Sequence, residues 1–230
     1  MLVHSCCVCA CEGAFLYYNE EEKLDYFILV MELIGACAFA VSGAMTGIRK
    51  NMDVFGACVL GLTVAVGGGV MRDIILGSFP PAMFHDPIYA ITAIVTCFIV
   101  FIPRIRKFLE NSSILMLLAD SIGLGIFTVS GAARAFEVTA NANVFLAVFV
   151  GVVTGVGGGL LRDIIAGEPP YIFVKHIYAT AAIVGAMVFC MLRVIIPKRP
   201  AMLAGAVLII VIRLLASHYR WSLPKPGNRE

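Results

Sequence analysis

Two stretches of the chain are near copies of one another: GGGVMRDIILGSFPP (Gly67–Pro81) and GGGLLRDIIAGEPP (Gly157–Pro170). Each combines three consecutive glycines with an Arg-Asp pair, and each follows a strongly apolar segment. A glycine in a helix interior costs about 1 kcal/mol relative to alanine, and a charged side chain at the centre of a bilayer costs about 2.5–3.5 kcal/mol. A combination this costly, present twice, indicates a functional or structural constraint at both places.

The composition places both stretches in a membrane protein. Of the 230 residues, 60% are hydrophobic and 14% are charged, with a mean hydropathy of +0.95, whereas soluble domains carry about 25% charged residues. Because about 20 apolar residues cross a bilayer as a helix, the sequence predicts an all-α integral membrane protein with seven spans. We expect the second and fifth to be interrupted at their glycines. The predicted spans are Tyr26–Ile48, Val54–Phe79, Pro87–Ile102, Ser113–Ala133, Val144–Ala166, Tyr171–Ile196 and Ala201–Ala216.

The two copies belong to a longer internal repeat. Asn51–Ile75 matches Asn141–Ile165 at 13 of 25 positions without a gap, and two further blocks align in the same order. These are Met31–Ala44 with Ala119–Ala132, and Ile88–Val95 with Ile177–Val184. A repeat of three spans must insert its second copy inverted, which places a transport site near the membrane midplane on matching helices. The predicted organisation is a tail (1–25), repeat 1 (26–110), repeat 2 (111–199), a seventh helix (200–217) and a C-terminal tail (218–230).

Positive charges in the loops predict the orientation. The loops on one side of the seven spans carry nine Lys and Arg residues and those on the other side carry four. The positive-inside rule then places the C-terminus in the cytoplasm and the N-terminus outside. The nine are Arg49, Lys50, Arg104, Arg106, Lys107, Lys175, Arg220, Lys225 and Arg229, and the four are Lys23, Arg134, Lys198 and Arg199.

Both glycine runs have two interpretations. A kink in each run would release backbone carbonyls that lipid cannot satisfy, so the glycines would have to face protein or a water-filled path. The alternative is close helix packing through small residues. We favour kinks that line a path. The residues concerned are Gly67, Gly68, Gly69, Gly157, Gly158 and Gly159.

The charges Arg72, Asp73, Arg162 and Asp163 should face the protein interior and be paired. Adjacent helix residues point about 100° apart, so we expect pairing across the repeats, Arg72 with Asp163 and Arg162 with Asp73. The carboxylates would attract a cation and the arginines would gate the path. A purely structural lock between the repeats is the alternative.

Other polar residues recur at equivalent places. Glu32 and Asp120 lie in the first and fourth spans, roughly 10 Å deep at 1.5 Å per residue. We expect them to concentrate cations at the two mouths of a path, or else to be hydrogen-bonded helix-end residues. Ser42 and Ser130, in the repeated VSGA, would line the path or bond the carbonyl four residues earlier in the same helix. Arg134 follows the fourth span and either snorkels to the interface or responds to the membrane field.

Enzymatic and nucleic-acid functions have no support. The chain contains no HExxH, GxSxG or Walker motif, and its net charge of +2 is unclustered. Four cysteines near the N-terminus fit no standard zinc spacing, so we predict no metal centre and no cofactor. These are Cys6, Cys7, Cys9 and Cys11.

The duplicated GGGxxRDII, followed by Gly and a Pro-Pro pair within a three-plus-three-plus-one helix layout, resembles the prokaryotic trimeric intracellular cation channel family. Its bacterial members are also grouped as glycine-transporter-like membrane proteins. The resemblance extends from about Tyr26 to Ala216. It implies a homotrimer in the bacterial inner membrane, with one pore per protomer kinked at the two glycine runs, which conducts monovalent cations, chiefly potassium. A basic residue on the fourth span is linked to voltage response in animal relatives, and Arg134 is its approximate counterpart here.

Two functions therefore stay open. The first is a passive potassium-permeable channel whose partners are its own copies, membrane lipid and the permeant cation. The second is a carrier for a small zwitterion such as glycine, with a helix N-terminus holding the carboxylate and Asp73 or Asp163 holding the amine. An inverted repeat fits both, and the chain has no TVGYG filter that would define selectivity.

Overall fold

Ten α-helices and no β-strand make up the part of the chain that the structure describes. This computed structural model describes all residues except 1–2, 140–141, 175–176, 220 and 222–230, and side chains from Tyr26 onward other than those of Ser113 and Val174. The helices are α1 (Val3–Arg49), α2 (Val54–Leu76), α3 (Ala82–His85), α4 (Ile88–Val100), α5 (Pro103–Glu110), α6 (Ser113–Val138), α7 (Val144–Ile165), α8 (Tyr171–Val174), α9 (Ala179–Leu192) and α10 (Lys198–His218).

Five helical segments within the described residues are long and apolar enough to cross a membrane. They are Tyr26–Arg49 within α1, Val54–Leu76, Ile114–Val138, Val144–Ile165 and Lys198–His218. A sixth candidate is α4 together with α5, which are bent by 85° relative to one another. The chain is therefore an all-helical integral membrane protein. Five of the predicted spans correspond to these long helices.

The predicted third and sixth spans are shorter in the structure than in the sequence analysis. The third ends where α4, of 13 residues, gives way to α5 at Pro103. The sixth consists of the separate helices α8 and α9, and α9 has 14 residues. At 1.5 Å per residue, α4 and α9 are each about 20 Å long, less than the roughly 30 Å of a bilayer core.

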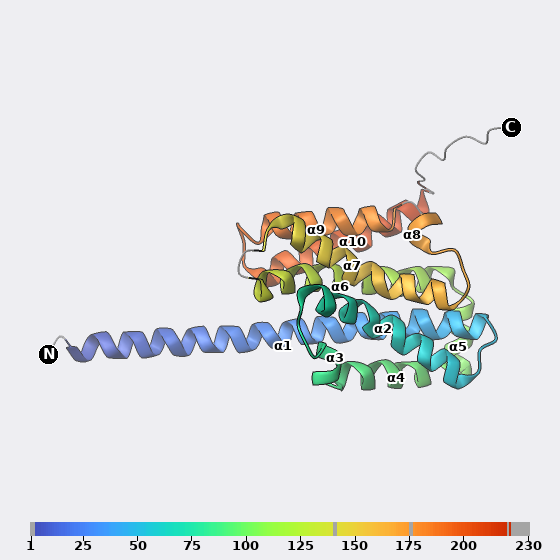
Figure 1. Cartoon of the computed structure of the whole chain (residues 1–230), viewed down its shortest axis with the longest axis horizontal. Helices are drawn as coiled ribbons and strands as arrows, with labels where there is room; N and C mark the ends of the chain where they lie inside the picture. Colours follow the sequence, from blue (N-terminus) through green and yellow to red (C-terminus); the bar gives the residue numbers. More distant parts are fainter. Residues whose placement is uncertain (1–2, 140–141, 175–176, 220, 222–230) are drawn as a thin grey trace.

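The N-terminal part of α1 projects from the bundle (Figure 1). The region predicted as a tail before Tyr26 continues the α1 helix from Val3. The four N-terminal cysteines lie outside the residues whose side chains are described.

Two buried apolar clusters form the core. The first lies between α1, α2 and α4 and includes Phe39, Leu60 and Cys97. The second lies between α6, α7, α9 and α10 and includes Val150 and Phe189. The two halves meet where α2 packs against α7 and α1 against α6, in the middle of the bundle (Figure 1).

Matching local signals begin and end α2 and α7. Asp53 caps the start of α2 by accepting a hydrogen bond from Gly56 N at 2.6 Å, and Asn143 caps α7 by accepting from Leu146 N at 2.8 Å. Just after each helix, Gly77 (φ 69°) and Gly167 (φ 66°) adopt the left-handed conformation that favours glycine. The glycine that follows RDII by one residue in each copy therefore terminates its helix.

Candidate functional site

The helices α2 and α7 remain continuous α-helix through both glycine runs. We expected the glycines to interrupt both helices, and this expectation is wrong, since neither helix is broken. Flanking apolar residues and the packing of α2 on α7 keep the glycines helical. A bend without a break stays a prediction, as does a role in lining a path.

The central glycine of each run allows the two helices to approach closely. A methyl group at Gly68 would contact the backbone carbonyl oxygen of Thr154, and one at Gly158 would contact the carbonyl oxygen of Val64. These two contacts are equivalent, since Gly68 and Gly158, like Val64 and Thr154, are 90 residues apart. Close packing, the alternative considered from the sequence, is thus what these two glycines provide.

The other glycines of the runs have different surroundings. Side chains would meet a methyl group at Gly67 (Leu161) and at Gly157 (the sulfur of Met71, 2.8 Å). At Gly159 a methyl group would lie 2.6 Å from the hydroxyl of Tyr178, whereas Gly69 has no atom within 4 Å of that position. Gly69 instead borders a small cavity beside Arg72.

The Arg-Asp pairs are formed within each helix. Arg72 Nε donates to Asp73 Oδ1 at 2.8 Å, and Arg162 Nε donates to Asp163 Oδ1 at the same distance. All four residues are at least 95% buried. The expected pairing across the repeats is therefore wrong. The 100° between adjacent Cβ directions does not separate the charged groups, because the long arginine side chain curls back toward its neighbour.

The second carboxylate oxygen of each aspartate holds the following loop. Asp73 Oδ2 accepts a hydrogen bond from Ala82 N, and Asp163 Oδ2 accepts one from Tyr171 N, both at 2.8 Å. Ala82 and Tyr171 each come directly after a Pro-Pro pair. Each aspartate thus ties the loop that leaves its helix back to the Arg-Asp pair, which explains why the motif extends from the glycines to the prolines.

The far end of each arginine reaches an acidic residue on another helix. Arg72 Nη1 lies 3.2 Å from Glu32 Oε1, and Arg162 Nη1 lies 2.7 Å from Asp120 Oδ1. The carboxylates predicted at the mouths of a path are therefore buried and paired. We call Glu32, Arg72, Asp73 and Tyr89 the first cluster, and Asp120, Arg162, Asp163, Tyr178 and Arg213 the second cluster.

The two serines of the repeated VSGA have different partners. Ser42, on α1, accepts a hydrogen bond from Arg162 Nη1 at 2.6 Å and so joins the first half of the chain to the second cluster. Ser130, on α6, lines the cavity beside Glu32, but its hydroxyl lies 3.5 Å from the carbonyl of Phe127 in its own helix. Ser130 thus bonds a carbonyl of its own helix, three residues back and not the expected four, whereas Ser42 binds the charged side chain of Arg162.

The two clusters differ in the group that binds the second carboxylate oxygen of Glu32 or Asp120. Tyr89 donates its hydroxyl to Glu32 Oε2 at 2.8 Å. In the second cluster, Arg213 Nη2 binds Asp120 Oδ2 at 2.7 Å, and the Arg213 guanidinium lies 4.5 Å over the ring of Tyr178. Within the described part of the chain, the Tyr178 hydroxyl has no hydrogen-bond partner.

Sequence reasoning gave Arg213 no role, because α10 has no counterpart in the repeat. The signal available was a single arginine in the interior of an apolar helix, which is costly unless it is paired. Tyr89 and Tyr178 were also missed, although both lie in the repeated IYA block.

Each cluster borders a cavity. The first has a volume of about 220 Å³ and is lined by Glu32, Arg72, Tyr89, Ser130, Arg134 and Glu137, among others. The second has about 190 Å³ and is lined by Ser42, Arg49, Asp120, Arg162, Glu168 and Arg213, among others. Figure 1 shows α3 and α8, which follow α2 and α7, toward opposite ends of the bundle. The clusters thus lie toward opposite ends, and the Gly68–Gly158 crossing lies between them, one helical turn from each arginine.

Arg134 lies at the edge of the first cavity. It is half exposed and pairs with Glu137 at 3.2 Å, and Lys198 of α10 pairs with the same carboxylate. On the opposite side of the molecule, Lys50 and Glu168 pair at 2.9 Å beside the second cavity. Both cavities therefore have ion pairs near their outer edges.

Comparison with known proteins gives one family and a consistent set of relatives. The family model described as Glycine transporter matches residues 29–104 and 117–194, one segment in each half of the chain. A UPF0126 membrane protein of Deinococcus radiodurans is 38% identical over 84% of this chain and 89% of its own length. The UPF0126 inner membrane protein YadS of Escherichia coli is 36% identical over 85% of this chain and 93% of its own length.

Solved structures share the fold over nearly their full length. One, from work on the structural basis for conductance through TRIC cation channels, superposes with a TM-score of 0.78 at 36% identity and covers 87% of this chain and 98% of that chain. The trimeric intracellular cation channel orthologue of Rhodobacter sphaeroides superposes with a TM-score of 0.75 at 33% identity, over 84% and 98%.

Proposed function

Because the chain belongs to the prokaryotic trimeric intracellular cation channel family, whose repeated unit the Glycine transporter model describes, we propose that it forms a potassium-permeable channel for monovalent cations in a bacterial inner membrane. The observation that carries the proposal is the arrangement of two buried charged clusters, each beside a cavity, on either side of the glycine crossing of α2 and α7. Such an arrangement supports a path that enters from both ends of one protomer.

The charges of the clusters favour a cation over an anion. In the first cluster two carboxylates, Glu32 and Asp73, stand against the single guanidinium of Arg72. An excess of negative charge in a cavity with apolar walls raises the local concentration of cations. In the second cluster, Arg162 and Arg213 balance two carboxylates. The excess of negative charge thus belongs to the buried first cluster, since the charged side chains that line its cavity, Glu32, Glu137, Arg72 and Arg134, balance one another.

Opening of the path requires movement at the glycine crossing. In the structure, Gly68 and Gly158 bring α2 and α7 together with no room for a methyl group. We propose that α2 and α7 bend at the glycine runs and separate there, while Arg72 and Arg162 stay anchored to their aspartates. This would make the glycines the moving part of the gate and the Arg-Asp pairs its fixed supports.

We further propose seven spans arranged as two inverted repeats and a seventh helix, with the N-terminus outside and the C-terminus in the cytoplasm. Residues on a two-fold axis contact their own equivalents. Phe39 and Phe127, 88 residues apart, stack with ring centroids 5.4 Å apart, and Gly68 and Gly158 meet at the helix crossing. These contacts support a pseudo-two-fold axis between the halves. The two separate segments matched by the family model support it as well.

We propose a homotrimer with one path per protomer, which the relatives and the positions of the clusters support. The Rhodobacter sphaeroides relative is described as trimeric. In the present chain both clusters lie in one protomer, on either side of the Gly68–Gly158 crossing, which supports a path within each protomer.

A flux assay tests the proposal against a carrier, the alternative that the name of the family model raises. Purified protein in potassium-loaded liposomes is diluted into sodium-free buffer with a protonophore, and proton uptake is followed by a pH-sensitive dye. We expect rapid potassium release that glycine does not alter. Saturable uptake of labelled glycine, with no potassium release, would instead identify a carrier.

A further inference from the structure

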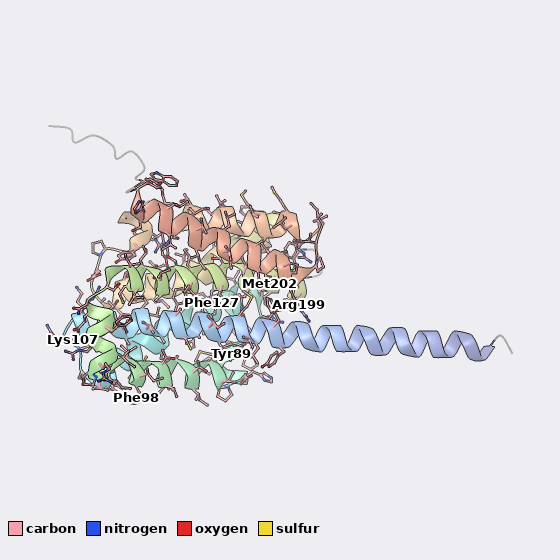
Figure 2. The ribbon with its side chains drawn as sticks, turned by 180° about the vertical axis from the view of Figure 1, so that it is seen from behind. Tyr89, Phe98, Lys107, Phe127, Arg199 and Met202 are labelled. Carbon is pink, nitrogen blue, oxygen red and sulfur yellow. The ribbon has the colours of Figure 1, made fainter. Side chains whose placement is uncertain are left out.

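The short helix α5 is the most strongly basic surface element in the described part of the chain. Its sequence, PRIRKFLE, contains three cations and one acid in eight residues. It follows α4 at an angle of 85° and crosses the end of the bundle near the turn between α1 and α2 (Figures 1 and 2). That turn contributes two further cations, Arg49 and Lys50.

The apolar and charged side chains of α5 lie on separate faces. Ile105 and Leu109, one turn apart, are half-buried, and Leu109 packs against the apolar cluster of the first half. Phe108 is 66% exposed although it is a large aromatic residue. Arg104, Arg106 and Lys107 are exposed as well. A helix with this pattern is typical of segments that lie in a membrane interface.

Two of the three cations of α5 form no ion pair with any side chain that the structure describes. Arg106 pairs with Glu110 at 3.1 Å, one turn away. Among the described residues, neither Arg104 nor Lys107 forms an ion pair. Lys107 lies at the outer end of the bundle (Figure 2). These two charges are therefore available to a ligand outside the chain.

The position of α5 identifies that ligand. The preceding helix α4 exposes a row of large apolar side chains that includes Ile91, Val95 and Phe98, as expected of a helix that faces lipid. If α4 crosses the lipid along the membrane normal, the 85° turn places α5 parallel to the membrane surface, at the level of the lipid headgroups.

We propose that α5 is a binding surface for anionic lipid. Phe108 inserts among the upper acyl chains, and Arg104 and Lys107 bind the headgroup phosphates. A basic residue near an anionic membrane surface raises the local preference for anionic lipid roughly fivefold. Nothing in this inference depends on whether the protein conducts ions.

The chain offers a direct test because it contains one tryptophan, Trp221. In the double variant W221F/F108W the only tryptophan reports on α5. The full-length protein is reconstituted in phosphatidylcholine liposomes that contain a small fraction of brominated phosphatidylglycerol or of brominated phosphatidylcholine. We expect the anionic quencher to be several times more effective than the zwitterionic one. When R104Q and K107Q are added to this variant, the anionic and zwitterionic lipids should quench the tryptophan equally.

The matched control places the reporter on α4. Phe98 is 57% exposed and faces lipid in the same half of the molecule (Figure 2). The variant W221F/F98W should therefore be quenched equally by both lipids. Equal quenching at position 108, or a preference that survives R104Q/K107Q, would overturn the proposal. Position 108 not being quenched by either lipid would also overturn it, since protein would then cover Phe108.

Discussion

The carboxylate of Asp120 is bound by Arg213 Nη2 at 2.7 Å, and among the described residues the equivalent carboxylate of Glu32 has no second arginine as a partner. Glu32 is held instead by the hydroxyl of Tyr89. The seventh helix, α10, thus supplies a second arginine to one of two otherwise matching clusters. The protein combines a repeated framework with a single unrepeated charge, so its two ends are electrically different.

Removal of that charge should change the shape of the current–voltage relation. In R213Q, Asp120 keeps Arg162, and the second cluster then has two carboxylates against one guanidinium, as the first does. We expect cation current to rise, by up to about tenfold from field focusing, and the relation to become more symmetric. Single-channel recordings of wild type and variant measure both changes.

The matched control for this prediction is R193Q. Arg193 is exposed and lies 3.8 Å over the ring of Phe136, outside both clusters. The R193Q substitution removes one positive charge, as R213Q does. If R213Q and R193Q shift the current–voltage relation alike, the charge asymmetry of the clusters has no part in conduction.

Adjacent glycines should respond differently to alanine. G68A places a methyl group against the carbonyl oxygen of Thr154, which is backbone and cannot move aside, so we expect a loss of about 1–3 kcal/mol from overpacking. G69A meets no atom within 4 Å and should leave stability unchanged or raise it by up to about 1 kcal/mol, since alanine favours helix. Thermal unfolding in detergent compares the two. Equal midpoints would show that α2 and α7 do not touch at Gly68.

The two tyrosines provide a test across the repeat. Y89F removes a hydroxyl that binds a carboxylate, and hydrogen bonds to charged groups contribute about 1.5–3 kcal/mol. Tyr178 has no hydrogen-bond partner for its hydroxyl within the described residues, so Y178F should have little effect. Unfolding midpoints in the same detergent measure the difference. A Y178F variant as unstable as Y89F would contradict this description of the second cluster.

Substitution of Asp73 or Asp163 should disturb the structure before it disturbs selectivity. Each carboxylate binds both an arginine and a backbone N–H, and breaking a buried ion pair costs about 3–5 kcal/mol. D73N should therefore lower the unfolding midpoint and increase proteolysis of the loop before α3. D86N, at an exposed aspartate that accepts only a local hydrogen bond from Ile88 N, is the control. A stable D73N protein without potassium flux would assign the carboxylate to conduction instead.

Hydropathy and the internal repeat predict much of this architecture. Of the seven spans predicted from the long apolar runs, five correspond to helices long and apolar enough to cross a membrane. An apolar helix forms all its backbone hydrogen bonds internally, which suits it to lipid. Equivalent residues such as Glu32 and Asp120 were identified because the repeat aligns them. The pairing of these two acids with the arginines of the repeated motif was not predicted, because spacing along the sequence does not tell which helices are neighbours.

The remaining differences have local physical causes. Pairing across the repeats was preferred to pairing within Arg72–Asp73 from helix geometry at Cβ, but a guanidinium lies several bonds beyond Cβ and can turn back. Helix breaks were expected from the low helix propensity of glycine, but tertiary packing of α2 on α7 overrides propensity at Gly68 and Gly158. Arg213 escaped notice because a residue outside the repeat has no equivalent that would draw attention to it.

The most direct test of the central claim is a planar-bilayer recording of the purified full-length protein under a potassium chloride gradient. A passive cation channel predicts discrete current steps that reverse near the potassium equilibrium potential. Currents that reverse near the chloride potential, or a silent bilayer from protein that is folded and inserted, would contradict it.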